Sequence, residues 1–423
     1  MLKPEDNERL TRVGAGTPMG TLLRRYWQPV LLSRELPERD GPPVRVRILG
    51  EDLVAFRDTQ DRIGLVDAYC PHRGAPMFYG RNEEHGIRCV YHGLKFDANG
   101  QCTDLPCVAE NARIRRNVRI KCYPTYENSG VIWTYMGPPE KQPARPDFEW
   151  MRAPATHRHV SKNYQANNYL QSLEGGLDTS HSSFLHNQTI GDNTAVRNVD
   201  GAPKIELFPT DYGYSYVSFR RFSDAARYIR VYQYIMPFQQ LRGNILDEYG
   251  KRRDVPIIEG HFWVPIDDTQ THTWNFMCGL DESVPLTPEY SEQREKRAGR
   301  GKDDFLPGTF MLKRNPSNDH MIDRELQKKT FTGLIGVATQ DIGIQEGMGP
   351  IVDRSKEILF ASDAAIVAMR RLLHDATRAV ERGDDPPGLD PSKYRNVRGY
   401  DCIVPNEVND WKSYMYERLG PKW

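Results

Sequence analysis

Short runs of alternating apolar and polar residues dominate residues 44–137. The runs are VRVRILG (44–50), DLVAFRD (52–58), RIGLVDAYC (62–70), IRCVYHGLKFD (87–97) and GVIWTYMG (130–137). A period of two residues is typical of β-strands, and DANG at 97–100 indicates a turn between two of them. After a short helical stretch around Thr21–Tyr26, the pattern predicts an all-β module that ends near Gly137. A proline-rich linker follows, so we expect one domain over 1–145 and a second over 146–423.

The second region mixes helical and strand patterns. Residues 167–186 predict a helix whose polar side chains turn inward, and the runs 212–222, 227–238, 257–268 and 271–280 predict an antiparallel sheet. The charged, turn-rich residues 284–330 predict long loops. Between Ser362 and Gly383, a plausible N-cap and a plausible C-terminal glycine, apolar residues three and four apart predict an amphipathic helix. Its stripe is Ile366, Met369, Leu373, Ala376 and Val380. The expected fold class is α+β.

Composition narrows the class of protein. The 423 residues exceed what one compact core holds, and the 57 basic and 57 acidic side chains leave no net charge for binding a polyanion such as nucleic acid. Seven scattered cysteines do not make a disulfide framework. The N-terminus lacks the apolar stretch of a secretory signal, and no run approaches the length of a membrane span. We therefore expect a cytoplasmic protein with neither a nucleic-acid nor a membrane partner.

Two short motifs in the β module could hold a metal cofactor. Cys70 and His72 form one pair, and Cys89 and His92 form the other. Thiolate and imidazole ligands are compatible with zinc or with an iron–sulfur cluster. Zinc ribbons usually pair C-x-x-C or H-x-x-x-H, whereas these halves are C-x-H and C-x-x-H. The spacing therefore favours a [2Fe–2S] cluster with two Cys on one iron and two His on the other, and the flanking text CPHRGAPM and CVYHGLKFD resembles the Rieske family.

The helix predicted over 167–186 carries a second set of possible ligands. Asp178 and His181 are three residues apart and would share a helix face. His181 and His186 are five apart and would diverge by about 140° on a regular helix. Both can bind one metal only if the helix ends or widens between them, where Ser182 and Ser183 stand. A polar network in the core is the alternative interpretation of these side chains.

The pattern E-x-x-x-D-x-x-H-x-x-x-x-H, from Glu174 to His186, resembles the iron-binding segment of Rieske ring-hydroxylating oxygenases, a family that covers essentially the whole chain. The resemblance implies an N-terminal all-β Rieske domain and a helix-grip-like catalytic domain, in which an antiparallel sheet is flanked by helices. It also implies a mononuclear Fe(II) bound by His181, His186 and a downstream carboxylate. The candidates for that carboxylate are Asp341, Glu346, Asp353 and Asp363; we choose Asp341, with Glu346 second.

The same resemblance implies how electrons reach the iron. Asp178 would bridge His92 of one subunit to His181 of the next in a homotrimer or a hexamer of stacked trimers, with a buried structural acid as the alternative. Glu174, one turn earlier, would either support this contact or be structural. The chain lacks a nucleotide-binding G-x-G-x-x-G motif and a plant-type cysteine cluster, so a separate ferredoxin and/or flavin reductase must supply electrons.

The C-terminal text QDIGIQEGMGPIVDRSKEILFASDAAIVAMRRLL resembles the phthalate dioxygenase branch, which includes chlorobenzoate and phenoxybenzoate dioxygenases and the dehydrodivanillate O-demethylase. An aromatic acid and O2 are then the expected substrates, and Arg220, Arg221, Arg230 and Arg242 are candidate carboxylate ligands. ERLTRVGAGTPMGTLLRRYWQPV is similar to the N-terminus of the demethylases. We therefore expect monooxygenation with O-demethylation, with cis-dihydroxylation as the alternative and a pure Rieske electron carrier as a third interpretation.

Overall fold

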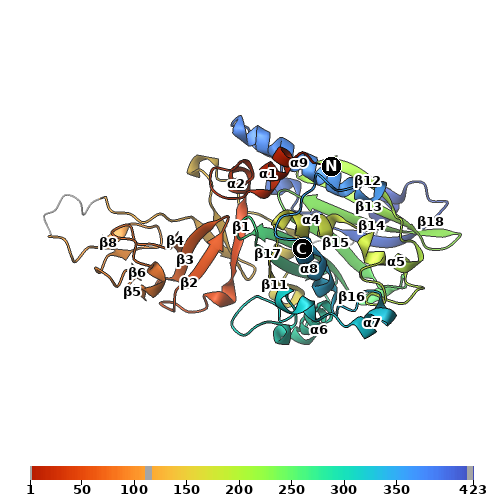
Figure 1. The fold of residues 1–423 in the computed structure, drawn as a ribbon, viewed down its shortest axis with the longest axis horizontal. Helices are drawn as coiled ribbons and strands as arrows, with labels where there is room; N and C mark the ends of the chain where they lie inside the picture. Colours follow the sequence, from red (N-terminus) through yellow and green to blue (C-terminus); the bar gives the residue numbers. More distant parts are fainter. Residues whose placement is uncertain (1, 110–116, 417–422) are drawn as a thin grey trace. The chain divides into compact units, whose positions relative to one another are not determined.

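The computed structural model describes residues 2–109, 117–416 and 423, and the chain forms two compact units (Figure 1). One unit contains Val13–Gly16 and Gly20–Pro143, and the other runs from Ala144 onward. The helix α1 (Pro4–Thr11) belongs to this second unit, where it contacts α4 (Tyr169–Leu177) and α9 (Ala364–Glu381). The sequence had assigned these N-terminal residues to the first domain.

The first unit consists of three small antiparallel sheets. Their orders are β1 (Trp27–Leu32), β10 (Val131–Tyr135) and β9 (Thr125–Asn128); β2 (Val44–Ile48), β3 (Glu51–Arg57) and β4 (Ile63–Asp67); and β5 (Arg81–Glu83), β6 (Gly86–Arg88), β7 (Lys95–Phe96) and β8 (Cys102–Asp104). Pairing of β1 with β10 joins the two ends of the unit. Short helical turns lie at α2 (Pro18–Leu23), η1 (Ser33–Glu35), η2 (Met77–Tyr79) and η4 (Pro139–Lys141).

The second unit is built on one eight-stranded antiparallel sheet. The path is β11 (Arg158–Gln165), β17 (Thr271–Gly279), β16 (Arg252–Pro265), β15 (Gln239–Leu246), β14 (Ala226–Ile235), β13 (Gly213–Arg221) and β12 (Lys204–Thr210), with β18 (Tyr400–Pro405) paired to β14. The four predicted strand runs correspond to β13, β14, β16 and β17. The other four strands, β11, β12, β15 and β18, were not predicted from the sequence.

Helices cover this sheet. α4 contacts α8 (Val337–Gly347) and both β16 and β17, while α9 lies along β12 and β13 (Figure 1). The remaining helices are α3 (Glu149–Arg152), α5 (Val196–Val199), α6 (Pro288–Ala298), α7 (Arg324–Thr330) and α10 (Trp411–Tyr416), and the 3-10 turns are η5 (Ala155–His157), η6 (His181–Ser183), η7 (Lys302–Asp304), η8 (Pro316–Met321), η9 (Ala361–Asp363) and η10 (Pro391–Lys393). The expected fold class, an all-β domain followed by a helix-flanked antiparallel sheet, is confirmed.

Two local predictions were wrong. Residues 284–330 are not only loops, because α6 begins behind Thr287, whose side chain accepts a hydrogen bond from the amide of Tyr290, and ends at Gly299 in the left-handed conformation. The helix predicted over 167–186 stops at Leu177, before the histidines rather than between them. Two glycines near its end, Gly175 and Gly176, lower its helix propensity.

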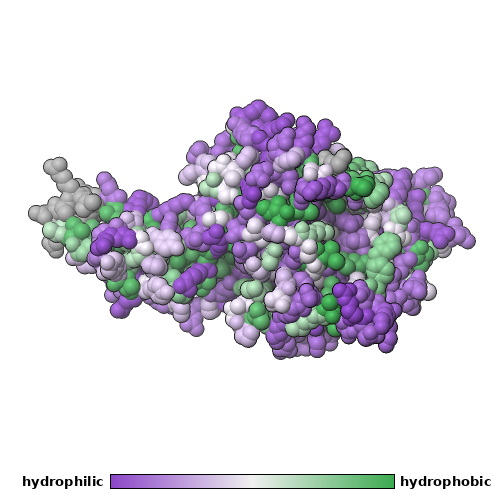
Figure 2. All heavy atoms as spheres, in the orientation of Figure 1, coloured by the Kyte–Doolittle hydropathy of each residue, from purple (hydrophilic) through white to green (hydrophobic). Residues whose placement is uncertain are grey.

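The displayed face of the molecule is mainly hydrophilic, with hydrophobic side chains in small groups between the polar ones (Figure 2). In the part of the chain that the structure describes, no helix is long and apolar enough to cross a membrane.

Candidate metal centres

Two matching loops present the cysteine and histidine motifs in the first unit. The carbonyl of Cys70 accepts a hydrogen bond of 2.9 Å from the amide of Gly74, and the carbonyl of Cys89 accepts one of 3.0 Å from the amide of Gly93. Both glycines adopt positive φ angles, +69° and +78°, which other residues rarely adopt. The sequence therefore folds each motif into a tight loop that starts at its cysteine.

The side chains of these loops separate into a buried pair and a more accessible pair. Cys70 and Cys89 are each 2% exposed, and burial, followed by the nearby Cys89 thiol, raises the pKa of Cys70 to about 11. The rings of His72 and His92 lie edge to face with centroids 4.4 Å apart. Two buried thiols beside two neighbouring imidazoles fit a [2Fe–2S] cluster with mixed ligands.

The second unit brings His181, His186 and Asp341 together. The Nε2 atoms of the two histidines are 3.2 Å apart, and Oδ1 of Asp341 lies 3.4 Å from Nε2 of His181 and 3.2 Å from Nε2 of His186. Among the described residues, this is the only group of three such side chains close enough to share one ion. Two imidazoles and one carboxylate converging from η6, the following turn and α8 fit a mononuclear Fe(II) with open positions.

Asp178 stands directly behind this group, as the residue that ends α4. One carboxylate oxygen accepts a 2.7 Å hydrogen bond from the amide of Ser180, and the other lies 3.3 Å from Nδ1 of His181. Burial opposes ionisation of Asp178, but the hydrogen bond and charge of His181, together with the backbone amides of Ser180 and His181, outweigh it and keep the pKa of Asp178 below its usual value. Asp178 and His181 therefore meet through a helix end and the turn after it, not through a shared helix face.

A residue that the sequence did not single out orients the other histidine. Oε1 of Gln340 lies 2.7 Å from Nδ1 of His186. The amide nitrogen of Gln340 donates to the hydroxyls of Thr189 and Thr332 and to the carbonyl of Leu334, at 2.9, 3.2 and 2.9 Å. Because a carbonyl can only accept, these contacts orient the amide and leave Oε1 to accept the Nδ1 proton. Nε2 of His186 then carries the lone pair that a metal requires.

Charge within the site is shared between imidazole and carboxylate. Burial disfavours the charged ring of His181, but hydrogen bonds to Asp178 and Asp341 outweigh it and raise its pKa to about 10. Burial also disfavours the Asp341 carboxylate, yet the two histidines hold its pKa well below the usual range. A divalent cation bound by these side chains would compete with protons for them, so its binding should depend on pH.

The other carboxylates considered as the third ligand lie elsewhere. Glu346 binds Nε2 of His320 at 2.7 Å and accepts a 2.7 Å hydrogen bond from the amide of Ala166. Asp353 binds Ser355 and Lys356. Asp363 directly precedes α9, and its carboxylate accepts a 2.7 Å hydrogen bond from the amide of Phe360.

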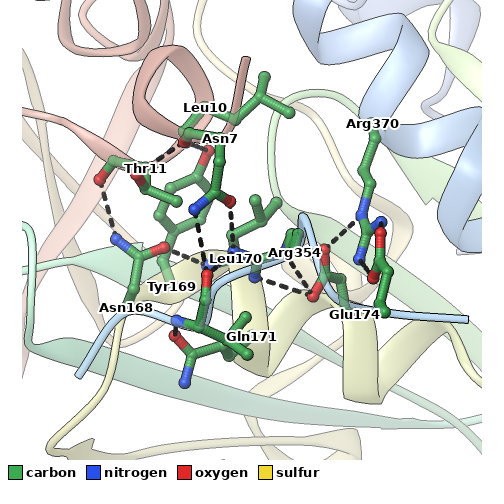
Figure 3. A network of polar contacts seen from close by, with 12 residues as sticks. Asn7, Leu10, Thr11, Asn168, Tyr169, Leu170, Gln171, Glu174, Arg354 and Arg370 are labelled. Carbon is green, nitrogen blue, oxygen red and sulfur yellow. Dashed lines mark hydrogen bonds and ion pairs between the residues drawn. The ribbon is translucent and has the colours of Figure 1, made fainter. Parts of the chain in front are cut away.

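Glu174 contacts Asp178 through the backbone, where its carbonyl accepts a 3.0 Å hydrogen bond from the Asp178 amide, whereas its side chain joins a network of arginines (Figure 3). Its carboxylate binds Arg354 at 2.8 Å and Arg370 at 2.6 Å. Arg354 also donates to Oδ1 of Asn7 in α1. The network joins α4 to α1, to α9 and to the segment after α8 (Figure 3).

A cavity of about 220 Å³ opens next to the histidine pair. One face of the sheet forms a wall: the register aligns Tyr232, Arg242 and Glu259 in one row and Gln240, His261 and Asn275 in the next. His181, His186 and Asp341 line the same cavity. A small molecule held there would lie beside the candidate metal ligands.

Of the arginines that the sequence proposed, two line the cavity and two do not. Arg230 and Arg242 contribute to it, whereas Arg220 is buried against the carbonyl of Thr179 and the hydroxyl of Ser183, and Arg221 is exposed. Arg197, which the sequence did not single out, also lines the cavity. Burial, followed by the nearby charge of Arg230, lowers the pKa of Arg197 to about 10. Arg197 lies on the short helix α5 and not on a predicted strand, so the sequence pattern did not indicate that it lines the cavity.

Comparison with known proteins decides the family. Residues 26–124 match the model of the Rieske [2Fe-2S] domain, and residues 134–419 match that of the LigXa C-terminal domain like family. The chain is 36% identical to the 3-chlorobenzoate-3,4-dioxygenase oxygenase subunit of Comamonas testosteroni, covering 99% of both chains. This chain belongs to the Rieske non-haem iron oxygenases. A [2Fe–2S] cluster and a catalytic mononuclear iron are the cofactors of this family.

Other relatives of the oxygenase differ in the reaction that their names give. The chain is 37% identical to the phthalate 4,5-dioxygenase oxygenase subunit of Pseudomonas putida, covering 98% of this chain and 95% of that one. It is 31% identical to the 5,5'-dehydrodivanillate O-demethylase oxygenase subunit of Sphingobium sp., covering 92% and 84%. Among solved structures, Pseudomonas putida NdmA (QL mutant with caffeine) aligns over 92% of this chain and 99% of that one, with a TM-score of 0.64 at 16% identity, which shows a shared fold.

Proposed function

We propose that the chain is the terminal oxygenase of a multicomponent system, which uses O2 and electrons from a reductase to oxygenate an aromatic carboxylate. The observation that carries the proposal is the His181–His186–Asp341 group opening into an arginine-lined cavity, in a chain that also has a Rieske domain. A pure electron carrier would need neither the group nor the cavity.

Each cofactor is assigned to a set of side chains. Cys70, His72, Cys89 and His92 would hold the [2Fe–2S] cluster. His181, His186 and Asp341 would hold Fe(II). When bound, the cluster supplies single electrons and the mononuclear iron supplies open positions for dioxygen. The task of the chain is then to hold the imidazoles with Nε2 free, to keep the Asp341 carboxylate ionised and to place the substrate beside them.

Electrons come from a separate protein, a ferredoxin and/or a flavin reductase. In a homotrimer or stacked-trimer hexamer, Asp178 would accept a hydrogen bond from His92 of a neighbouring subunit while it holds His181 of its own. A carboxylate between two ligand imidazoles fixes the tautomer and orientation of both rings. The contact of Asp178 with Nδ1 of His181 supplies one half of that bridge.

The cavity favours a substrate with a carboxylate. Arg197 and Arg230 line it, and neither forms an ion pair with a described carboxylate. Arg242 also lines it but is already paired with Glu259 at 2.9 Å. Arg230 donates to the carbonyl of Gly243 and lies near enough to Arg197 for the two charges to repel. Two guanidinium groups so placed favour an anionic group between them, and arginine can bind a carboxylate through two parallel hydrogen bonds. The related subunits named for chlorobenzoate and phthalate agree with an aromatic acid.

We propose monooxygenation of a methoxylated aromatic acid, in which the oxidised methoxy group leaves as formaldehyde, with cis-dihydroxylation of the ring as the second candidate. The relatives include both kinds of enzyme, an O-demethylase and dioxygenases. The test is product analysis of the loaded enzyme with a reductase, on methoxylated and plain benzoates. Formaldehyde and a phenol in equal amounts support demethylation, and a cis-diol without formaldehyde contradicts it. No oxygenated product from any aromatic acid would overturn the proposed function.

A further inference from the structure

His261 stands on the cavity wall, and a chain of hydrogen bonds settles which of its nitrogens carries the proton. These hydrogen bonds begin at Glu295 on α6. They continue along one row of the sheet, from Ser161 on β11 through Asn275 on β17 to His261 on β16. None of these residues belongs to the candidate iron site.

Every hydrogen bond in this series has a defined donor and acceptor, because the first residue, Glu295, can only accept. Burial opposes ionisation of Glu295, but the charge of Arg300, followed by His159 and Ser161, lowers its pKa to about 2. The hydroxyl of Ser161 must therefore donate to Glu295, at 2.9 Å. Its oxygen then accepts from Nδ2 of Asn275, at 3.3 Å. This sets the orientation of the amide, so Oδ1 of Asn275 faces Nδ1 of His261, at 2.9 Å, and accepts its proton.

The other nitrogen of His261 is consequently a bare acceptor. Burial, followed by the charges of Arg242 and Arg300, lowers the pKa of His261 to about 3, so the ring stays neutral. Nε2 has no hydrogen-bond partner among the described residues. Unlike the fully buried unpaired atoms of the protein, it retains some exposure. The ring of Trp263 packs beside the His261 ring, with the two centroids 5.4 Å apart, and the hydrogen bond to Asn275 holds the orientation of the imidazole. A fixed lone pair on a cavity wall can be satisfied only by a donor from the cavity.

We infer that Nε2 of His261 accepts a hydrogen bond from a hydroxyl group on the substrate, which makes the preferred substrate a hydroxylated aromatic acid. This rests on the proposed function, because it takes the cavity to be the aromatic-acid site. Arg197 and Arg230 would bind the carboxylate, and His261 would select among aromatic acids by the presence and position of a donor. A site built to pair with a hydroxyl discriminates strongly against analogues that lack one, since its own polar group is then left unpaired.

The test compares matched ligands on the loaded enzyme by anaerobic calorimetry. Each of 2-, 3- and 4-hydroxybenzoate is paired with the fluorobenzoate that carries fluorine at the same ring position. Fluorine is similar in size to a hydroxyl group but donates no hydrogen bond. The wild-type enzyme should bind the hydroxy member of at least one pair about tenfold tighter or more. His261→Phe should remove this preference by weakening only the hydroxy ligand. His261→Gln, which can offer an oxygen acceptor, should retain part of it.

Thr273→Val is the matched control, because Thr273 lines the same cavity but its hydroxyl donates to Gln165 within the protein. This variant should keep the wild-type preference. If the wild-type enzyme binds no hydroxybenzoate more tightly than its fluorobenzoate partner, the assignment of His261 is overturned, and this measurement does not depend on any variant folding. An unchanged preference for the hydroxy ligand in His261→Phe overturns it as well. Failure of every benzoate to bind would instead overturn the proposed aromatic-acid function, and this inference with it.

Discussion

At the scale of single residues, the metal site depends on side chains that hold its ligands. Gln340 is fully buried, and three acceptors orient its amide so that Oε1 faces His186. It directly precedes Asp341 in α8, so one helical segment supplies both a candidate ligand and the support of another. Such supporting hydrogen bonds set which nitrogen of a histidine is free to bind metal.

Replacing Gln340 with Met should weaken binding of Fe(II) or Co(II) at the mononuclear site by about 10- to 100-fold, because Nδ1 of His186 loses its acceptor. Cobalt titration of enzyme depleted of mononuclear metal measures the effect, and the absorbance of the Rieske cluster should not change. Gln345→Met is the control, since Gln345 is buried in the same helix but accepts from Gln165 instead of a histidine. Equal affinities in the Gln340→Met variant and the wild type would contradict the role.

At the scale of elements, α4 delivers Asp178 and the turn with His181 to the site, and a buried charge network holds this helix. Arg354, with 1% of its side chain exposed, and Arg370, with 7%, both bind Glu174. Removing one member of a buried network leaves the other charges unpaired. The position of the helix end, and with it of Asp178, therefore depends on residues nearly 200 positions away in the chain.

Glu174→Gln should lower the free energy of unfolding by about 3 kcal/mol at pH 7. Burial raises the pKa of Glu174, but Arg354 and Arg370 outweigh this and lower it below 4.5. A depressed folded-state pKa stabilises the protein above the unfolded value, so the difference between variant and wild type should shrink as pH falls below 4.5. Denaturant unfolding across pH measures it. The exposed Glu8, paired with Arg12 in α1, is the control: Glu8→Gln should change stability by less than about 1 kcal/mol.

At the scale of the whole molecule, the proposed electron route joins two chains. Asp178→Asn should leave both metal sites loaded but reduce turnover by about 100-fold or more, because the amide is uncharged and one of its two side-chain atoms donates instead of accepting. Iron analysis together with turnover measures this. Full activity with normal coupling in the variant would remove Asp178 from the route.

Mixed oligomers give the matching control. A His92→Ala chain and an Asp178→Asn chain are each expected to be inactive alone. Within a mixed oligomer, His92 of the Asp178→Asn chain can face the intact Asp178 of the other chain, so co-expression should restore part of the activity. Failure to restore any would contradict a route between subunits.

The sequence by itself determined the motifs whose members are close along the chain. Cys70 and His72, Cys89 and His92, and the segment from Asp178 to His186 could be recognised because a loop or one turn holds each set together. Asp341, chosen from the resemblance of its D-x4-E segment, lies against the two histidines in the structure, and its role as an iron ligand stays a prediction. The strands with clean alternation were also predictable, since that pattern is local.

Only the tertiary structure decided the rest, because it depends on which distant segments pack together. The end of α4 at Leu177 reflects packing and two glycines, so the histidines lie on a turn and not on a helix. Arg197, Gln340 and His261 carry no local signal: each acquires its role from a neighbour more than ten residues away, across the cavity or across a strand pair. Hydrogen-bond direction and desolvation, which set the state of these side chains, exist only once the sheet and its helices have closed around the cavity.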